Sequence, residues 1–220
     1  DEPNAAFLSY VTGAANEGKQ LKFPDDSYPN ILVFDFGAGT CDISILEVGK
    51  DNNGVYSKNI AISRFEKLGG NDIDKLIAVD ILLPQILKNS GLKVSDFRTR
   101  ELNEVIIPKL LKPAEQLKIK ISEAISLKAT SLVITELALS KDYLTLGTNI
   151  TIDTSKGVLN LDEPRLSYTE FANINSVFTN ENEISNTKRI ENEVEFINIF
   201  NPIKSALKKA KINKDEIDYV

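Results

Sequence analysis

Apolar and polar residues in the first third of the chain predict three sequential β-strands. Apolar β-formers fill residues 31–36, and a second such segment covers 42–48 after the small residues Gly37-Ala38-Gly39-Thr40. A third segment, 55–66, has roughly alternating polarity and follows a glycine- and asparagine-rich turn at 49–54. Short connections of this kind join antiparallel neighbours. We therefore expect a three-stranded meander whose first turn is rich in glycine.

Helical spacing of apolar residues predicts most of the remaining elements. We expect a helix near the N-terminus, helices over 73–89 and 98–124, and helices that begin at Ser167 and Asn201. Ser167 and Glu170 have capping-box spacing. The polar run 179–189 is interpreted as a surface loop or a solvated helix, and residues 216–220 resemble the first residues of a strand.

Prolines and β-branched residues refine these expectations. Pro84 predicts a kink or a break, and Pro108 and Pro113 predict that 98–124 is divided, with a second piece from Pro113 to Ser122. Residues 126–166, which include SLVITELAL, are rich in β-formers and contain a hairpin turn at 154–157. We therefore expect strands throughout this stretch.

The first glycine turn has the composition of a phosphate-binding site. Consecutive backbone N–H groups at Gly37, Ala38 and Gly39 can face an anion, and Thr40 adds a hydroxyl group. Asp35 and Asp42 place one carboxylate at each end of the turn. A triphosphate with a divalent cation would suit this mixture. The alternative is an ordinary hairpin, because Asp and Gly are also the commonest turn residues.

A glycine pair precedes the helix predicted over 73–89. Gly69 and Gly70 allow a sharp turn and a close approach to a ligand, while Asn71 or Asp72 could cap the helix. The helix N-terminus would then be offered to an anion. A plain capped helix after a strand is the alternative interpretation.

One face of the second predicted helical piece carries three polar side chains. Glu115, Lys118 and Ser122 are spaced i, i+3 and i+7, so they lie on one side of a helix. Such a row can point at a common ligand. A solvated helix face would show the same spacing, and this alternative stays open.

Composition and charge narrow the classes of function. The chain has 220 residues, of which 32 are acidic and 26 basic, and its net charge of −6 argues against nucleic acid and anionic membrane as partners. Cys41 has no second cysteine to pair with, and the absence of histidine removes the usual catalytic base. No apolar run approaches a membrane span, and no residue is methionine, so we expect an excerpt of a longer protein.

Five segments resemble the ATPase domain of the seventy-kilodalton heat-shock chaperones of the DnaK type. They occur in the same order and spacing, and they are DEPNAA at 1–6, ILVFDFGAGTCDISILEVG at 31–49, LGGNDID at 68–74, AEQLKIKIS at 114–122 and ALKKAKINKDEIDYV at 206–220. The resemblance implies the second lobe of an actin-like ATPase domain, an α/β fold of the ribonuclease H-like class. The implied core comprises 1–68 and 166–220, with 69–165 inserted as a smaller α+β subdomain.

The resemblance also implies roles for individual residues toward ATP or ADP, Mg²⁺ and K⁺. By position, Glu2, Asp35 and Asp42 resemble the family's carboxylates around the metal ions and the attacking water. Asp72 would reach a metal ion through water. Residues 37–40 resemble the family's second phosphate loop, in which Thr40 would lie near the terminal phosphate. Gly70, Asn71 and Asp72 are similar to the family's segment over the ribose and phosphates. Glu115, Lys118 and Ser122 are similar to the helix face that holds adenosine in the family.

Two departures from the family pattern concern nucleotide affinity. Ala38 stands where the family usually has glycine, which costs about 1–2 kcal/mol only in a left-handed conformation. Ile119 stands where the family usually has an arginine that lies on the adenine ring, so the cation–π part of that contact is missing.

The implied function is a cytoplasmic chaperone ATPase lobe in which nucleotide drives lobe closure and controls a peptide-binding domain outside this chain. A nucleotide-exchange factor and a J-domain co-chaperone are the implied partners. The isolated chain is expected to be inactive, because it carries one side of the nucleotide cleft. An actin-like bacterial filament protein and a sugar or metabolite kinase of the same fold are the alternatives.

Overall fold

The computed structural model describes residues 4–10, 28–51, 54–66, 68–128, 131–179 and 198–220. The chain divides into two compact units. The first unit comprises Asp1–Gly69 and Ile184–Val220, and the second unit comprises Gly70–Glu183.

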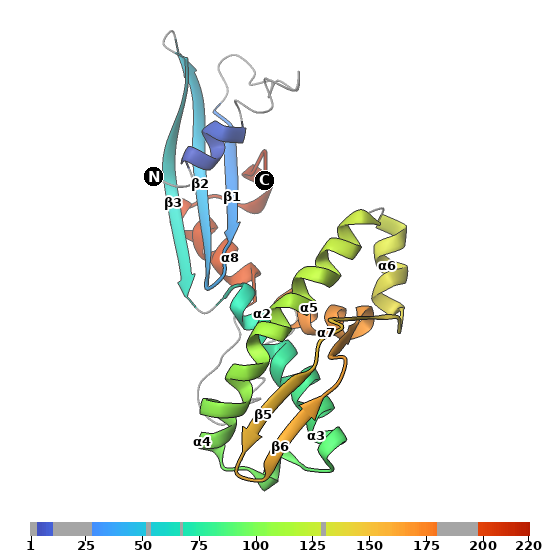
Figure 1. The fold of residues 1–220 in the computed structure, drawn as a ribbon. Coiled ribbons are helices and arrows are strands. Elements are labelled where there is room, and N and C mark those ends of the chain that lie inside the picture. The colour runs from blue at the N-terminus through green and yellow to red at the C-terminus, as the bar shows by residue number, and fades with distance from the viewer. Residues whose placement is uncertain (1–3, 11–27, 52–53, 67, 129–130, 180–197) are drawn as a thin grey trace. The chain divides into compact units, whose positions relative to one another are not determined.

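A three-stranded antiparallel sheet forms the centre of the first unit (Figure 1). It contains β1 (Asn30–Phe36), β2 (Thr40–Asp51) and β3 (Gly54–Glu66) in sequential order, so the predicted meander is confirmed. The second turn is shorter than predicted, because Gly49 still belongs to β2 and pairs with Tyr56. A Cβ atom on Gly49 would collide with the Tyr56 ring, so glycine allows the aromatic side chain to lie across the strand.

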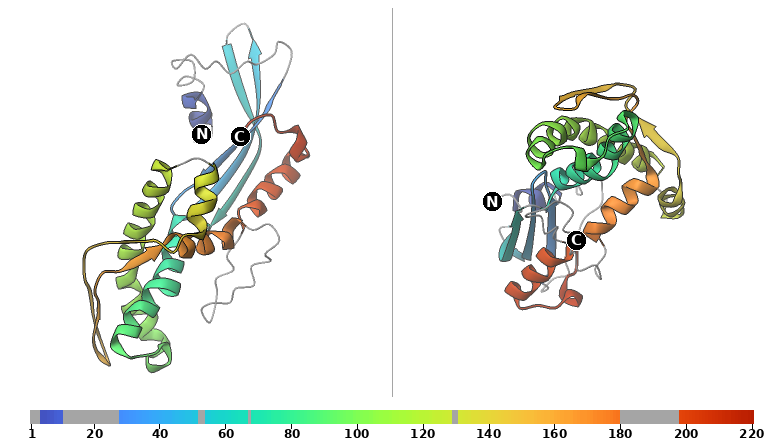
Figure 2. Two further views of the ribbon diagram at one scale, coloured as in Figure 1. Left: turned by 90° about the vertical axis from the view of Figure 1, so that its right-hand side faces the viewer. Right: turned by 90° about the horizontal axis from the view of Figure 1, so that it is seen from below.

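Helical segments cover both faces of this sheet (Figure 2). On one face, residues 4–10 are helical and complete a small apolar cluster of Phe7, Ile31, Leu46 and Val48. On the other face, α8 (Phe200–Ala210) packs against β2 and β3, where Ile43 and Ile45 are fully buried. Lys209 of α8 donates a hydrogen bond to the backbone oxygen of Ile62 at 2.8 Å. The helix predicted to begin at Asn201 is confirmed to within one residue.

The last residues of the chain lie beside β1. After the short 3₁₀ helix η4 (Lys214–Glu216), Tyr219 forms a parallel bridge with Ile31. The backbone N–H of Leu32 donates to the Tyr219 oxygen at 2.9 Å. The strand predicted at 216–220 is therefore confirmed in part, as one bridge parallel to β1.

The second unit begins with a continuous helical stretch. It consists of α2 (Gly70–Leu76), the π-helix η1 (Ile77–Leu82) and α3 (Leu83–Ser90). Because α2 begins at Gly70, Asn71 and Asp72 lie in its first turn and not at the predicted cap. Pro84 does not break the helix, because it lies in the first turn of α3, directly after the wider π-helical turn.

The next helical stretch is also less interrupted than expected. After the 3₁₀ helix η2 (Val94–Asp96), the chain forms α4 (Thr99–Glu101), the π-helix η3 (Leu102–Ile106) and α5 (Ile107–Leu127). The predicted division at Pro113 is wrong, since α5 continues through it. Pro113 lacks the N–H that would donate to the Lys109 carbonyl oxygen, and Lys109 is an exposed residue.

The strand predicted within SLVITELAL is wrong, because these residues form α6 (Ser131–Leu139). Its apolar residues fall in two short runs, 132–134 and 137–139, which fit neither a clear helical nor a clear strand period, so tertiary packing decides the conformation. Helix α6 packs against α7 (Tyr168–Thr179). Contacts with α6, together with the strand that precedes α7, place α7 in the second unit, whereas the sequence-based division assigned 166–220 to the core.

Two short antiparallel pairs complete the second unit. The hairpin of β5 (Ile150–Thr154) and β6 (Gly157–Leu161) contains the predicted turn, and β6 packs on α3. Strands β4 (Tyr143–Thr145) and β7 (Arg165–Ser167) form the other pair. The predicted capping box at the start of α7 is confirmed, since Glu170 accepts hydrogen bonds from the N–H and hydroxyl groups of Ser167.

Some expectations fall on residues that the structure does not describe. These are the start and end of the N-terminal helix, at 1–3 and from 11 onward, and residues 180–189 of the polar run. None of the helices in the described ranges has the length and hydrophobicity of a membrane span.

Candidate functional site

The glycine turn between β1 and β2 is closed by one backbone hydrogen bond, from the Gly37 N–H to the Thr40 oxygen at 2.9 Å. Within the part of the chain that the structure describes, the N–H groups of Ala38 and Gly39 have no hydrogen-bond partner, and both residues are exposed. Ala38 does not adopt a positive φ. Alanine therefore causes no left-handed strain here, and the turn offers two consecutive donors to an anion.

Asp35 and Asp42 lie directly opposite each other in the last but one residue pair before this turn. Opposed residues of an antiparallel pair point to the same face of the sheet, with Cβ atoms about 4.5–5.5 Å apart. Asp35 is exposed and Asp42 is half-buried. Like charges in this position are destabilising unless a cation lies close to both.

Cys41 lies between the turn and Asp42 and is completely buried. Burial, followed by the negative charges of Asp42 and Asp35, raises the pKa of the thiol from 9.0 to about 11. The thiol therefore stays protonated at neutral pH, which argues against a nucleophilic or redox role for it.

The raised pKa of Cys41 predicts a specific alkaline destabilisation. Below about pH 9 the thiol is protonated in the folded and unfolded chains, so its contribution to stability is fully present. Between about pH 9 and pH 11 the unfolded chain loses this proton first, so the free energy of unfolding falls as pH rises. Urea unfolding at about pH 8 and about pH 10.5 should therefore show a larger loss in the wild type than in Cys41→Ala. Equal losses in the two proteins would contradict the assignment.

Gly69, at the end of the first unit, packs against the backbone of the glycine turn. A Cβ atom on Gly69 would lie 2.5 Å from the Ala38 oxygen and 2.8 Å from the Gly37 oxygen. Real Cβ atoms do not approach backbone oxygens so closely, so only glycine lets this segment support the turn. The contact joins two segments that are about thirty residues apart in sequence.

In the second unit, Lys118 joins α5 to the start of α2. Its Nζ donates to Asp74 Oδ2 at 2.8 Å and to the Gly70 oxygen at 3.1 Å. The Asp74 side chain is 8% exposed and the Lys118 side chain 19% exposed. Burial raises the pKa of Asp74, although the hydrogen bond and charge of Lys118 act in the opposite direction. Desolvation therefore outweighs the attraction, as is common for buried ion pairs.

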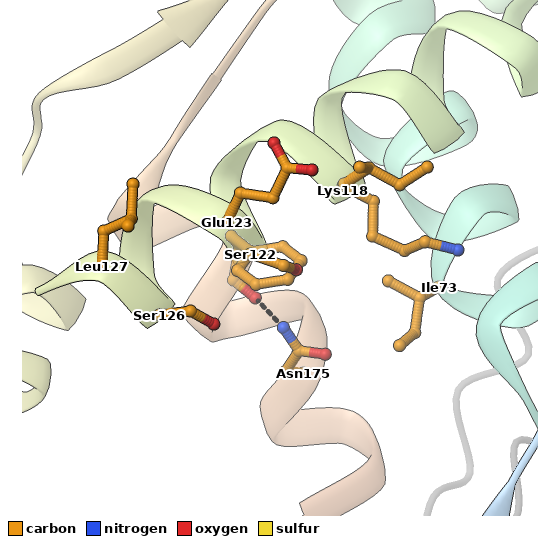
Figure 3. Close-up of a pocket in the computed structure, with 9 residues that line it drawn as sticks. Ile73, Lys118, Ser122, Glu123, Ser126, Leu127 and Asn175 are labelled. Carbon is orange, nitrogen blue, oxygen red and sulfur yellow. Dashed lines mark hydrogen bonds between the residues drawn. The ribbon is translucent and has the colours of Figure 1, made fainter. Parts of the chain in front are cut away.

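A hollow of about 800 Å³ opens beside this ion pair (Figure 3). Its lining comes from α2, α5 and α7 and comprises Ile73, Lys118, Ile119, Ser122, Glu123, Ser126, Leu127, Phe171 and Asn175. Figure 3 shows Lys118 extending from α5 past Ile73, with Ser122, Glu123 and Ser126 further along the same helix. A mainly apolar lining with a few polar groups is typical of a small-molecule site.

The structure places the predicted site residues in two groups. Asp35, Asp42 and the turn 37–40 belong to the first unit, where they lie together at one end of the sheet. The other group belongs to the second unit and comprises Gly70, Asn71, Asp72, Glu115, Lys118 and Ser122. Lys118 and Ser122 line the hollow, whereas Glu115 is not among its lining residues. Glu2 lies outside the described residues.

A directly held metal has no complete ligand set in the described parts of the chain. There, no group of three or more His, Cys, Asp or Glu residues is arranged to hold an ion. The opposed pair Asp35 and Asp42 supplies two carboxylates. This donor set suits Mg²⁺, which keeps several waters and commonly binds only one or two carboxylates.

Three further residues of the second unit were not predicted from the sequence. Phe171 and Asn175 reach the hollow from α7, and no local pattern connects α7 with α5. The sequence does contain an indication that Asp74 is buried, because Asp74 shares a helical face with the apolar residues Ile77 and Ala78. A single carboxylate on a buried helical face requires a charged partner, which is Lys118.

Comparisons with known proteins assign this chain to a family. The family model described as Hsp70 protein matches residues 1–147. The Chaperone protein DnaK 1 of Synechococcus sp. is 39% identical over 122 residues, which are 56% of this chain. The matched part spans only 13% of that relative's length. Because the family model covers more than half of the sequence, the chain belongs to the Hsp70 family.

Proposed function

We propose that this chain is a nucleotide-binding lobe of a chaperone ATPase. Considered separately, the glycine turn of the first unit suits a phosphate group, and the hollow of the second unit suits a nucleoside. Family membership supports this function over the two alternatives, a filament protein and a sugar or metabolite kinase. ATP or ADP is the proposed ligand.

The observation that carries this proposal is the pair of exposed donors at Ala38 and Gly39. In the described part of the chain neither N–H group has a hydrogen-bond partner, and both residues are exposed, so the two donors are open to a ligand. A phosphate group accepts hydrogen bonds from such consecutive donors. Phosphate binding would thus explain both the composition of the turn and its exposure.

Magnesium would make the two aspartates compatible with a bound triphosphate. Asp35 and Asp42 would hold the ion mainly through water, and the ion would neutralise charge on the phosphate oxygens. K⁺ could share the same carboxylates. Asp72 belongs to the second unit, and its proposed contact with a metal through water rests only on the family resemblance.

The two departures from the family pattern have unequal consequences. Alanine at position 38 adds little conformational strain, because Ala38 does not adopt a positive φ. Ile119 is 47% exposed at the hollow, so it can cover one face of a flat base without the cation–π attraction of an arginine. We therefore expect normal phosphate binding and a weaker contact with the base.

In a full-length protein that contains this chain, nucleotide would drive lobe closure and so control a peptide-binding domain. A nucleotide-exchange factor and a J-domain co-chaperone would be the partners. These roles rest on family membership, because the chain matches only a small part of its relative.

The purified chain should bind ADP but hydrolyse ATP far more slowly than a complete ATPase domain. Phosphoryl transfer needs phosphate contacts from both sides of a cleft, and the proposed lobe carries one side. Calorimetric titration with ADP and a phosphate-release assay with ATP test both parts. Absence of ADP binding would overturn the proposed function. Hydrolysis at the rate of a complete domain would contradict the single-lobe assignment.

A further inference from the structure

The two aspartates beside the glycine turn belong to a cross-strand row that continues onto β3. Asp35 of β1 is paired with Asp42 of β2, and Asp42 is paired with Arg64 of β3. Residues that are directly opposed in adjacent antiparallel strands share one face of the sheet. The row therefore places two acidic residues and one basic residue at neighbouring register positions, at the end of the sheet that carries the turn.

A second charged row crosses the sheet farther from the glycine turn. Glu47 of β2 is paired with Lys58 of β3 and with Asn30 of β1. The formal charges of this row balance, because the residue on β1 is neutral. In the row beside the turn the residue on β1 is Asp35, so one negative charge remains in excess.

The basic residue at position 64 sets the net charge of the row beside the turn. Opposed carboxylates repel each other, whereas an opposed carboxylate and guanidinium group attract. Arg64 lowers the net charge of the row from two negative charges to one. One remaining carboxylate is enough for Mg²⁺, which keeps most of its waters when it binds to a protein. A row without the basic residue would attract cations more strongly.

We propose that Arg64 is a positioning residue for the cation beside the glycine turn, which supplies a fixed positive charge to Asp42 and so directs a metal ion toward Asp35. The two carboxylates then have unequal roles. Asp42 is half-buried and is compensated by the protein, whereas Asp35 is exposed and open to hydrated Mg²⁺. This inference goes beyond the proposed nucleotide binding, because it concerns the affinity of the row for a cation without nucleotide.

Titration of the 220-residue chain with MgCl₂ at constant ionic strength, followed by the amide resonances of residues 37–40, measures this affinity. Arg64→Gln should bind Mg²⁺ about 2- to 5-fold more tightly than the wild type, because a positive charge near the ion is removed. Arg64→Lys keeps the charge and should retain the wild-type affinity. A merely structural role would lower the affinity of Arg64→Gln or leave it unchanged. Either result, or equal affinities of Arg64→Lys and Arg64→Gln, would overturn the inference.

The matched control is Lys58→Gln, which also removes a basic residue of β3 that is opposed to an acidic residue of β2. Lys58 is exposed, and its row contains Glu47 as the single carboxylate. This variant should keep the wild-type affinity for Mg²⁺ at the turn, because salt screens charges at that distance. An equal gain in Lys58→Gln and Arg64→Gln would assign the effect to the net charge of the chain and refute the role of Arg64.

A double substitution separates action through Asp42 from a general effect of charge. Strands β1 and β3 lie on opposite sides of β2, so they are about 9–10 Å apart, twice the spacing of adjacent strands. Arg64→Gln should therefore change the Mg²⁺ affinity less in an Asp42→Asn background than in the wild type. Equal factors in the two backgrounds would show that Arg64 does not act through Asp42.

A measurement that leaves Arg64 in place keeps the inference testable if Arg64→Gln does not fold. The ¹⁵Nε resonance of Arg64 should shift in Asp42→Asn and stay nearly unchanged in Asp35→Asn, because only Asp42 is directly opposed to it. Equal shifts in the two variants would contradict the proposed role. Absence of Mg²⁺ binding in both the wild type and Arg64→Gln would overturn this inference alone, whereas Mg²⁺ binding without ADP binding would overturn only the proposed function.

Discussion

Replacing Asp35 or Asp42 by asparagine should lower ATP hydrolysis by on the order of 100-fold in a full-length protein that contains this chain. The two carboxylates are directly opposed beside the glycine turn, where their charge would hold Mg²⁺ against the phosphates. Asparagine keeps the shape of the side chain and removes its charge. Single-turnover hydrolysis with Mg²⁺ and ATP measures the effect.

Nucleotide binding and folding should change much less in these variants. The donors at Ala38 and Gly39 belong to the backbone and do not depend on either carboxylate. Asp153→Asn, on an exposed position of β5 in the second unit, is a matched control that should keep the wild-type rate. Wild-type hydrolysis in both Asp35→Asn and Asp42→Asn would return the turn to an ordinary hairpin.

Gly69→Ala should destabilise the first unit and displace the glycine turn. The new Cβ atom would lie 2.5 Å from the Ala38 oxygen, so the backbone of one segment must move. Overpacking of this kind costs about 1–3 kcal/mol. For a chain of this size we expect the melting temperature to fall by roughly 2–4 °C for each kcal/mol. Thermal unfolding followed by circular dichroism, together with ADP titration, detects both effects.

Gly37→Ala is the matched control for this substitution. A Cβ atom on Gly37 would meet the Thr40 oxygen at 3.4 Å, which is ordinary contact, and Gly37 does not adopt a positive φ. Its stability should therefore change by less than about 1 kcal/mol. If the two variants melt at the same temperature, the contact between Gly69 and the turn does not support the fold.

Much of the first unit follows from local patterns. Alternating or continuous apolar β-formers separated by glycine-rich turns predicted β1, β2 and β3, and the structure has them in the predicted order. The α/β class and the actin-like ATPase fold implied by the family motifs are confirmed by membership of the Hsp70 family. These features could be predicted because each depends on residues that are close together in the sequence.

The second unit was predicted less well where local signals were ambiguous. Six of the nine residues of SLVITELAL are apolar, and its packing against α7 accompanies a helix where a strand was expected. Pro84 and Pro113 are compatible with continuous helix in this structure, because a π-helical turn precedes one and solvent reaches the region around the other. Helix propensity describes proline only by its average cost in a helix, so it does not predict that these two local environments tolerate proline.

The sequence by itself determined where the glycine turn lies, which residues compose it and which family the motifs resemble. Only the tertiary structure decided that Asp35 and Asp42 are in exact opposition, that Gly69 packs on the turn, and that Asp74 holds Lys118. The physical reason is the sequence separation of the interacting residues, because backbone conformation and periodicity are set by neighbours in the chain. Contacts between segments tens of residues apart are selected by packing and by the pairing of buried charges.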